Sequence, residues 1–207
     1  GMENIYQRQV PPVQDIPQGE AGPSLAFRKL DMESDLPVLH NWVSHPQAAR
    51  FWQLNGYDRE KLHNLYSELL LKPGYHSLIG LYGGKPVCQV DVYRVCTGEL
   101  SPFLPQAGDN DCGLHFLMAP PRESFKGLSL LMLRGFMDMY FSFPFAGDLY
   151  AEPDELNALA NRLAVKAGFR LFKKASLQDK IANVYKITKQ QYLAGTTLMT
   201  SFPGTGL

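Results

Sequence analysis

The chain has 207 residues, of which 45% are hydrophobic and 12% aromatic, which is enough to bury one substantial core. Twenty Lys and Arg residues balance twenty Asp and Glu residues, and no basic block stands out, so nucleic acid is not an expected partner. The three cysteines have neither a CxxC motif nor a histidine at metal-ligand spacing, so we expect reduced thiols, no metal site and a cytoplasmic location.

The two ends differ in character from the rest of the chain. Residues 3–24 are rich in Pro, Gln and Gly without periodicity, which predicts an N-terminal arm, residues 1–24, that is loosely ordered or lies on a partner surface. We expect a single folded domain over residues 25–195 and a C-terminal tail over residues 196–207. The most apolar segment, residues 128–145, is interrupted by Arg134, Asp138 and Pro144, so neither a membrane span nor a membrane partner is expected.

The first half of the domain predicts a strand, several helices and a hairpin. Alternating polarity predicts an edge strand at residues 25–30, and Asp31 or Ser34 could cap a helix that places Leu36, Leu39 and Val43 on one face. Further helices are predicted at residues 46–54 and 58–71. Two β-rich runs between residues 76 and 95 meet at Gly83-Gly84, a pair that tolerates positive φ, and predict a hairpin.

The second half alternates strands and helices. Strands are predicted at residues 111–118, 148–152, about 169–173 and 181–187, and helices at residues 127–141 and within 152–169. The later helix carries an apolar stripe expected to face the sheet, formed by Leu156, Leu159, Ala160, Leu163 and Ala167, and Gly168 is expected to end it. This order predicts an α/β-type, three-layer domain in which helices cover one mixed sheet.

The start of the helix at residues 127–141 is a candidate anion site. Arg122, Lys126, Gly127 and Ser129 stand where a strand gives way to the helix, so free amides, the positive helix end and two cations would converge there. A pyrophosphate would suit such a site. An ordinary helix N-terminus with solvated cations has the same composition, and a single glycine is a weak signal.

The segment from residue 157 to residue 169 resembles motif B of the GCN5-related N-acetyltransferases (GNATs). Its pattern is matched in register by Asn157, Ala160, Leu163, Gly168 and Phe169. In many GNATs a tyrosine within this motif protonates the leaving thiolate of coenzyme A. Here Ala164 stands in its place, which implies that this chain handles protons elsewhere.

Further motifs are similar to those of one GNAT subgroup, the siderophore-biosynthesis acyltransferases that acylate a hydroxylamine. The matching elements, spread over residues 40–182, are W-x-x-x-P-x(4)-F-W through Trp42, Pro46, Phe51 and Trp52; G-x-P-x(4)-E-x-Y, with Asp91 for Glu and with Tyr93; D-x-G-x-H ending at His115; E-P-D-x-x-N at residues 152–157; and D-K-x-A at residues 179–182. Their joint order and spacing make the resemblance specific. It implies a GNAT-like α+β fold, with a mixed, mostly antiparallel sheet covered by helices on both faces.

The resemblance also implies acetyl-CoA or another acyl-CoA as cosubstrate, without a metal. The residues that would contact it are Phe116, Leu117, Met118, Arg122, Lys126, Gly127, Leu128, Ser129 and Asn157. The pyrophosphate loop departs from the family pattern [QR]-x-x-G-x-[GA]. Either Phe125 occupies its middle glycine, or Gly127 does in a shifted register.

Acyl transfer to nitrogen needs a base, and His115 is the candidate because imidazole accepts protons near neutral pH. The resemblance implies that Asp154 orients the imidazole or holds a cationic amine. Alternatively, His115 is structural and Asp154 is the N-cap of its helix. Trp52, Asp91 and Tyr93 are candidates for an aromatic and acidic acceptor pocket, whereas Trp42 is expected in the core.

The predicted function is acyl-CoA-dependent acylation of a small hydroxylamine or amine in hydroxamate siderophore biosynthesis, by a monomer or homodimer. One alternative is an aminoglycoside or polyamine N-acetyltransferase, which would have a more acidic acceptor side. The other is a catalytically inactive module that binds coenzyme A, which Ala164 and the unusual loop favour.

Overall fold

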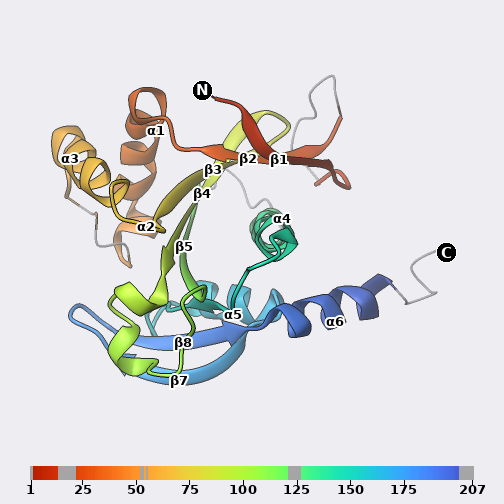
Figure 1. The fold of residues 1–207 in the computed structure, drawn as a ribbon. Helices are drawn as coiled ribbons and strands as arrows, with labels where there is room; N and C mark the ends of the chain where they lie inside the picture. The colour runs from red at the N-terminus through yellow and green to blue at the C-terminus, as the bar shows by residue number, and fades with distance from the viewer. Residues whose placement is uncertain (1, 14–21, 52–53, 55, 121–126, 201–207) are drawn as a thin grey trace. The chain divides into compact units, whose positions relative to one another are not determined.

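The computed structural model describes residues 2–13, 22–51, 54, 56–120 and 127–200, and the chain forms two compact units (Figure 1). The first unit draws on residues 1–93 and 115–139, and the second on residues 94–114 and 140–207. Strand β5, Cys112–Met118, and helix α4, Leu128–Ser142, each contribute residues to both units. Among the helices described, none combines the length and the apolar character needed to cross a bilayer.

The first unit is built on an antiparallel sheet. Strands β1 (Asn4–Gln9), β2 (Ser24–Lys29), β3 (His76–Tyr82) and β4 (Lys85–Arg94) are hydrogen-bonded neighbours in that order. The predicted hairpin is confirmed, and both residues of its turn, Gly83 and Gly84, have positive φ, at 57° and 80°. Strand β1 was not predicted. It lies in the segment expected to form an arm and pairs with β2.

Helices α1 (Met32–Ser44), α2 (Pro46–Ala49) and α3 (Arg59–Leu69) follow β2, and α1 packs against α3. The predicted cap is confirmed, because the Asp31 carboxylate accepts a hydrogen bond of 3.2 Å from the Glu33 amide. The helix predicted over residues 46–54 is shorter: α2 ends at Ala49, and a turn follows in which the Phe51 amide donates to the Ala48 carbonyl.

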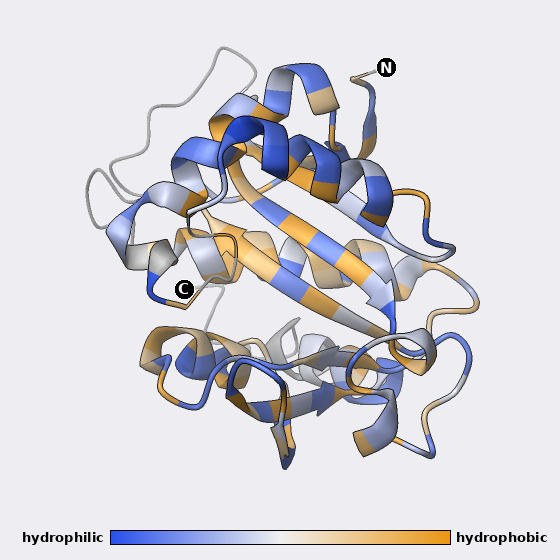
Figure 2. Cartoon of the chain, turned by 90° about the vertical axis from the view of Figure 1, so that its left-hand side faces the viewer, coloured by the Kyte–Doolittle hydropathy of each residue, from blue (hydrophilic) through white to orange (hydrophobic). Residues whose placement is uncertain are grey.

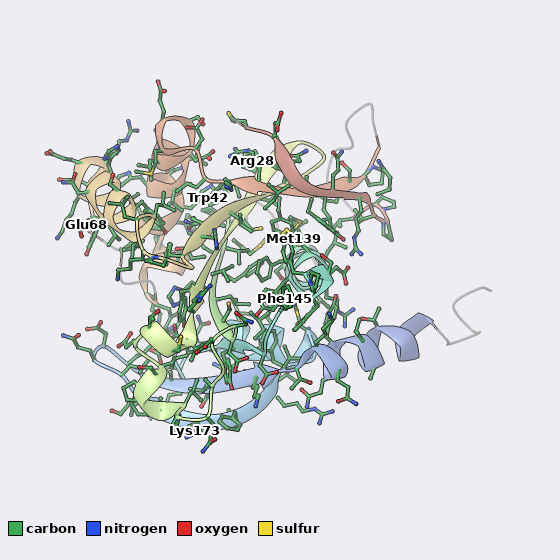
Figure 3. The ribbon with its side chains drawn as sticks, in the orientation of Figure 1. Arg28, Trp42, Glu68, Met139, Phe145 and Lys173 are labelled. Atoms are coloured by element: carbon green, nitrogen blue, oxygen red, sulfur yellow. The ribbon has the colours of Figure 1, made fainter. Side chains whose placement is uncertain are left out.

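One core cluster joins these helices to the sheet. It contains the buried residues Leu36, Leu39, Trp42, Val43, Leu62, Tyr66 and Leu117. The expectation that Trp42 belongs to the core is therefore confirmed, and its side chain lies between α1 and the strands (Figure 3). Glu68, on the outer side of α3, is exposed. On the same side of the sheet, Arg28 makes a buried bidentate ion pair with Asp35, with N–O distances of 2.6 and 2.9 Å.

Helix α4 covers the opposite face of this sheet. Its Phe136 ring meets the Phe27 ring edge-on at 6.1 Å. A Cβ atom added at Gly135 would lie 2.8 Å from Leu25, and one added at Gly80 would lie 2.3 Å from the Cys88 sulfur and 2.9 Å from Met132. These two glycines therefore permit close packing of the helix on the strands. With α1 and α3 on one face and α4 on the other, the three predicted layers are confirmed in this unit (Figure 1).

The strand sequences of this sheet also alternate between hydrophobic and polar residues, which point to its two faces. Side chains alternate between faces, so Phe27 and Arg28 point to opposite sides of β2. Figure 2 shows the long strands of this unit banded with hydrophobic and hydrophilic residues. The polar residues among these bands, which include Arg28, Ser77, Gln89 and Asp91, are nevertheless buried. Most of their hydrogen-bonding groups are therefore paired inside the protein, with backbone or with other side chains.

The second unit contains β6 (Leu149–Ala151), β7 (Arg170–Ser176) and β8 (Ile181–Ile187). Strand β6 pairs in parallel with the start of β5 and antiparallel with β8, and β7 pairs antiparallel with β8. The prediction of a mixed, mostly antiparallel sheet is therefore confirmed. Its core cluster draws on Val95 and Leu100 from the short helices η1 (Val95–Thr97) and η2 (Ser101–Phe103) and their surroundings. Helix α6 (Lys189–Thr200) was not predicted.

Helix α5 (Ala158–Lys166) corrects one prediction. The apolar stripe expected to face the sheet is wrong at Leu156 and Leu159, which are 70% and 59% exposed, whereas its member Ala167 is buried as predicted. The buried positions are Ala164 and Ala167, each 5% exposed. Asn157 caps the helix, so Leu156 precedes its first turn, and the small alanines form the side that approaches the strands.

Candidate active site

His115 lies on β5 with its imidazole half-buried against Tyr93 of β4. The two ring centroids are 5.1 Å apart, and the rings are tilted by 41°. Further along, the Ala119 amide donates to the Val87 carbonyl at 2.8 Å. Tyr93 of β4 thus lies opposite His115, and Val87 of β4 lies opposite Ala119, which follows β5. Residue numbers therefore rise in opposite directions along the two strands, so β4 and β5 run antiparallel here and His115 lies beside residues 91–93. Two predicted site residues, His115 and Tyr93, are thus in contact.

Asp91, the third candidate on this part of the sheet, is buried at 3% exposure and accepts three hydrogen bonds from hydroxyl groups. Its Oδ2 accepts from Tyr66 of α3 at 2.9 Å and from Tyr75 at 2.7 Å, and its Oδ1 accepts from Ser77 at 2.6 Å. Gln89 Nε2 donates to the hydroxyl oxygens of Tyr66 and Ser77 at 2.8 and 2.9 Å. We refer to Tyr66, Tyr75, Ser77, Gln89 and Asp91 as the hydroxyl cluster.

Burial sets the electrostatics of the hydroxyl cluster. Loss of water raises the pKa of Asp91 above its ordinary value, and the three hydroxyl donors and the positive charge that His115 can carry offset this rise only in part. Burial, followed by the adjacent Asp91 charge, raises the pKa of Tyr66 and of Tyr75, so both phenols stay protonated donors. The cluster therefore holds a carboxylate surrounded by neutral hydroxyls.

Asp154, the other predicted catalytic residue, lies in the second unit between β6 and α5. Its Oδ1 accepts a hydrogen bond of 2.9 Å from the Leu156 amide. The helix N-cap is Asn157, whose Oδ1 accepts from the Ala160 amide at 3.2 Å. The alternative in which Asp154 caps this helix is therefore wrong. Asn157, whose contact with the cosubstrate stays a prediction, thus supplies the helix cap.

The segment that carries Asp154 is fixed to the start of β8. Asp154 forms a β-bridge with Ala182, the Asn183 amide donates to the Pro153 carbonyl at 3.0 Å, and the Glu155 amide donates to the Ile181 carbonyl at 2.9 Å. Beside them, Lys180 and Glu152 form an ion pair of 2.6 Å with side chains 17% and 6% exposed. Two motifs that were recognised separately, at residues 152–157 and 179–182, are thus held together.

Asn161 of α5 completes this attachment, and sequence reasoning missed it. Its Nδ2 donates to the carbonyls of Asp154 and Asn157 at 2.9 and 2.7 Å, while its Oδ1 accepts from Asn183 Nδ2 and the Tyr185 hydroxyl, both at 2.8 Å. One amide side chain therefore ties the loop before α5 to strand β8. Every donor and acceptor group of that amide is used.

The candidate cosubstrate residues are partly described. Gly127 precedes α4 with a φ of 89°, and a Cβ added there would meet no atom within 4 Å. Ser129 lies in the first turn and is half-buried, whereas Leu128 is buried. On β5, Phe116 and Met118 are half-buried and Leu117 packs in the core cluster of α1 and α3. Arg122, Lys126 and Trp52 lie outside the described residues.

The members of the hydroxyl cluster other than Asp91 were also missed. Gln89 and Asp91 are two residues apart in a strand that is otherwise apolar at residues 87–92, and Ser77 pairs with Asp91 across the hairpin. Two polar residues on one face of such a strand indicate a buried polar cluster. Tyr66 and Tyr75 carried no comparable signal, because phenols also fill ordinary cores.

Comparison with known families gives one match that covers most of the chain. Residues 31–177 match the family described as acetyltransferase (GNAT) domain. The match includes β3, β4, β5 and α5, and so contains His115, Asp91 and Asp154. The strand that precedes it, β2, lies outside the matched range.

Two curated relatives share this region. A putative lysine N-acyltransferase of Schizosaccharomyces pombe is 26% identical over 123 residues, which are 59% of this chain and 34% of that protein. The N-hydroxyputrescine acetyltransferase of Acinetobacter baumannii is 23% identical over 169 residues, which are 82% of this chain and 80% of that protein. The chain thus spans about a third of the first relative and most of the second.

Solved structures share the fold. An uncharacterised protein from Bacillus halodurans superposes with a TM-score of 0.79 at 22% identity, over 93% of this chain and 95% of its own. The aminoglycoside acetyltransferase AAC(6')-Ib, in complex with coenzyme A, superposes with a TM-score of 0.75 at 20% identity, over 83% of this chain and 99% of its own. The predicted fold class is confirmed by these two matches.

Proposed function

This chain belongs to the GNAT acetyltransferase family, and from that premise we propose that it acylates the nitrogen of a small hydroxylamine, as in the formation of a hydroxamate siderophore. As a GNAT N-acyltransferase, it uses an acyl-CoA as the donor. The observation that carries the finer proposal is the half-buried imidazole of His115 against Tyr93, at the strand position where the siderophore acyltransferases have D-x-G-x-H. Similarity to an N-hydroxyputrescine acetyltransferase over 82% of the chain supports it.

In the proposed reaction His115 acts as the general base. The acceptor nitrogen attacks the thioester carbonyl, a C–N bond forms, the C–S bond breaks, and coenzyme A leaves as its thiolate while His115 takes the proton from nitrogen. A hydroxylamine is a weak base and is largely neutral near pH 7, so its lone pair is available for attack. A base near neutrality then suffices, and the absence of a tyrosine at Ala164 is tolerated.

Asp154 would bind a cationic amine of the acceptor. Its Oδ1 accepts one hydrogen bond from the Leu156 amide, and its position is set by the β-bridge to Ala182 and by the bonds of Asn161. A fixed, half-buried carboxylate suits the ammonium group of an N-hydroxylated diamine or of lysine. Tyr93 and Trp52 would supply aromatic contacts to its alkyl chain.

The cosubstrate would bind at the start of α4. The left-handed conformation of Gly127 and the open space around it leave the first amides of the helix, including those of Leu128 and Ser129, available to an anionic group. Arg122 and Lys126 would add positive charge. This proposal expects Arg122→Ala or Gly127→Pro to weaken acyl-CoA binding in an isothermal titration, and unchanged affinity in both would place the site elsewhere.

The test of the function is a product analysis. Purified protein is incubated with a mixture of acetyl-, succinyl- and longer acyl-CoAs and with N-hydroxylated putrescine, cadaverine or lysine, and products are identified by mass spectrometry. We expect a hydroxamate with one of these acceptors and a much lower rate with the parent amine. Thermal stabilisation by coenzyme A without turnover of any acceptor would support the inactive binding module instead.

A second candidate function is acetylation of an aminoglycoside or polyamine. It is favoured by the likeness in fold to AAC(6')-Ib, although at 20% identity this concerns the fold alone. Kanamycin and spermidine therefore belong in the acceptor panel. Faster turnover of either than of every hydroxylamine would select this candidate.

A further inference from the structure

The hydroxyl cluster contains a buried negative charge whose hydrogen-bonding partners are all neutral. Asp91 is 3% exposed, and its hydrogen-bond donors in the described part of the chain are the hydroxyls of Tyr66, Tyr75 and Ser77. The contrast is Asp35 of the same unit, which is 5% exposed and bound twice by Arg28. A buried carboxylate needs either a countercharge or several donors to stay ionised. Asp91 has the donors.

Gln89 determines which way those donors point. Both of its amide hydrogen bonds run to hydroxyl oxygens, those of Tyr66 and Ser77. Each of these hydroxyls therefore accepts from Gln89 and turns its own hydrogen to Asp91. Gln89 Oε1 is buried without a hydrogen-bond partner in the described part of the chain. The orientation of the amide therefore leaves its oxygen unpaired while its nitrogen makes both hydrogen bonds to the hydroxyls. A protonated Asp91 would disrupt it, because Oδ1 and Oδ2 both already accept hydrogens.

His115 can place a positive charge close enough to Asp91 to stabilise it. Its ring contacts Tyr93, which lies two residues from Asp91 on the same face of β4, and β5 runs antiparallel beside these residues. The positive charge of a protonated His115 stabilises the ionised form of Asp91. Because the interaction between two titrating groups is reciprocal, the ionised form of Asp91 stabilises the protonated form of His115 to the same extent. The titratable groups that face Asp91 from α3, from the segment before β3 and from β5 are Tyr66, Tyr75 and His115.

We propose that Asp91 is a positioning residue of the reaction: its buried carboxylate stabilises the imidazolium that His115 becomes when it takes the proton from the acceptor nitrogen. The acceptor-pocket role predicted for Asp91 is replaced, since a carboxylate that is 3% exposed and accepts three internal hydrogen bonds has no surface left for a substrate. In this proposal Asp154 is the carboxylate that binds the acceptor. The inference rests on the proposed function for its catalytic meaning, but the coupling of Asp91 to His115 does not.

The first experiment is an NMR titration of His115 in the protein without substrates. The imidazole signal of His115 is assigned by its loss in His115→Gln. In Asp91→Asn the proton affinity of His115 should fall on the order of tenfold, because a nearby opposite charge is removed. Tyr75→Phe removes a donor whose positive end faces Asp91, so it should shift the titration the opposite way, to higher pH, by a smaller amount. This second variant changes only a hydroxyl of a half-buried side chain and keeps the proposal testable if Asp91→Asn does not fold.

Two control variants separate charge from general damage. Asp35→Asn removes another buried carboxylate of the same unit, and Asp154→Asn removes the rival partner; neither should move the His115 titration. An unchanged titration in folded Asp91→Asn would overturn the proposal. So would an equal shift in Asp154→Asn, or a downward shift in Tyr75→Phe.

The second experiment measures rate against pH with an acceptor found in the product analysis. The acidic limb of kcat/KM reports the proton affinity of the free base, so in Asp91→Asn it should move to lower pH together with the NMR titration. The same limb in Asp154→Asn should stay in place while KM for the acceptor rises. If no acceptor is turned over, the proposed function fails, and the NMR titration still decides whether Asp91 acts on His115.

Discussion

At the scale of a single residue, His115 is the base that we propose for the reaction. His115→Ala removes the base but leaves the start of α4 untouched, so kcat should fall by about 10²- to 10⁴-fold with little change in acyl-CoA affinity. Steady-state kinetics and a coenzyme A titration of the same sample measure the two quantities. Asp154→Asn should be as severe or milder. Near-normal turnover in folded His115→Ala would contradict the assignment and leave Asp154 or a water chain as the base.

Ala164 allows a second prediction at this scale. It is 5% exposed on the side of α5 that approaches the strands, where a phenol ring has no room to enter without displacing neighbours. Ala164→Tyr should therefore lower the unfolding temperature and give no gain in kcat, even though many GNATs have tyrosine there. Circular dichroism melting and turnover on the same acceptor test it. Ala164→Ser, which adds little volume, is the control and should keep most of the stability.

A site residue could be predicted from the sequence when its role depends on neighbouring residues in the chain, and it was missed when its role depends on distant segments. His115 and Tyr93 were identified from short motifs, and the structure brings them into contact. Asp91 was identified as well, but its burial depends on α3 and Tyr75, which no motif near residue 91 encodes. Asn161 was missed because its four bonds join segments up to 24 residues apart in the chain.

The loop before α5 gives the prediction at the scale of elements. Lys180 and Glu152 are mostly buried, so Lys180→Met leaves a buried carboxylate without its cation and should reduce the free energy of unfolding by about 3 kcal/mol. Lys174 and Glu155 form an ion pair of 2.8 Å one strand away, but its lysine is 62% exposed. Lys174→Met should therefore cost about 0.5 kcal/mol or less. Urea unfolding measures both variants, and equal losses would mean that burial does not distinguish the two pairs.

The elements themselves were predicted well where their pattern was strong. The strand at residues 181–187 was predicted with its observed bounds, and the hairpin turn followed from two glycines that adopt positive φ. The buried side of α5 was wrong, since exposed Leu159 and buried Ala164 reverse the order that hydrophobicity predicts. Hydrophobic periodicity assumes that the larger apolar side chain is the buried one, and this helix needs small residues to lie close to the strands.

Alkaline pH tests the molecule as a whole. Burial raises the pKa of Tyr66, Tyr75 and Tyr140 above the ordinary phenol value of about 10, and it raises the pKa of the Cys88 thiol above its ordinary value. Above these ordinary values the unfolded chain loses protons that the folded chain keeps, so the folded state holds more protons and stability falls as pH rises. Each group contributes up to ~1.4 kcal/mol per pH unit in this range.

We therefore expect the midpoint of urea unfolding to fall between about pH 9 and about pH 11, most steeply above pH ~10 where the phenols of the unfolded chain lose their protons. Tyr140→Phe removes one of the responsible phenols, so its midpoint should fall less than that of the wild type over the same interval. A midpoint that stays constant over this range would show that the buried phenols and the thiol do not control alkaline stability.

Gly80 and Cys88 face each other across the β3–β4 hairpin, and the sulfur of one occupies the space that a side chain on the other would need. The two positions therefore share a single volume beneath α4. Gly80→Ala alone would overfill it, and Cys88→Gly alone would leave a void, while Gly80→Ala with Cys88→Gly restores the total. In evolution these two positions are expected to change together. A relative with a larger residue at position 80 should have a smaller residue at position 88, so the residues at the two positions should covary in an alignment.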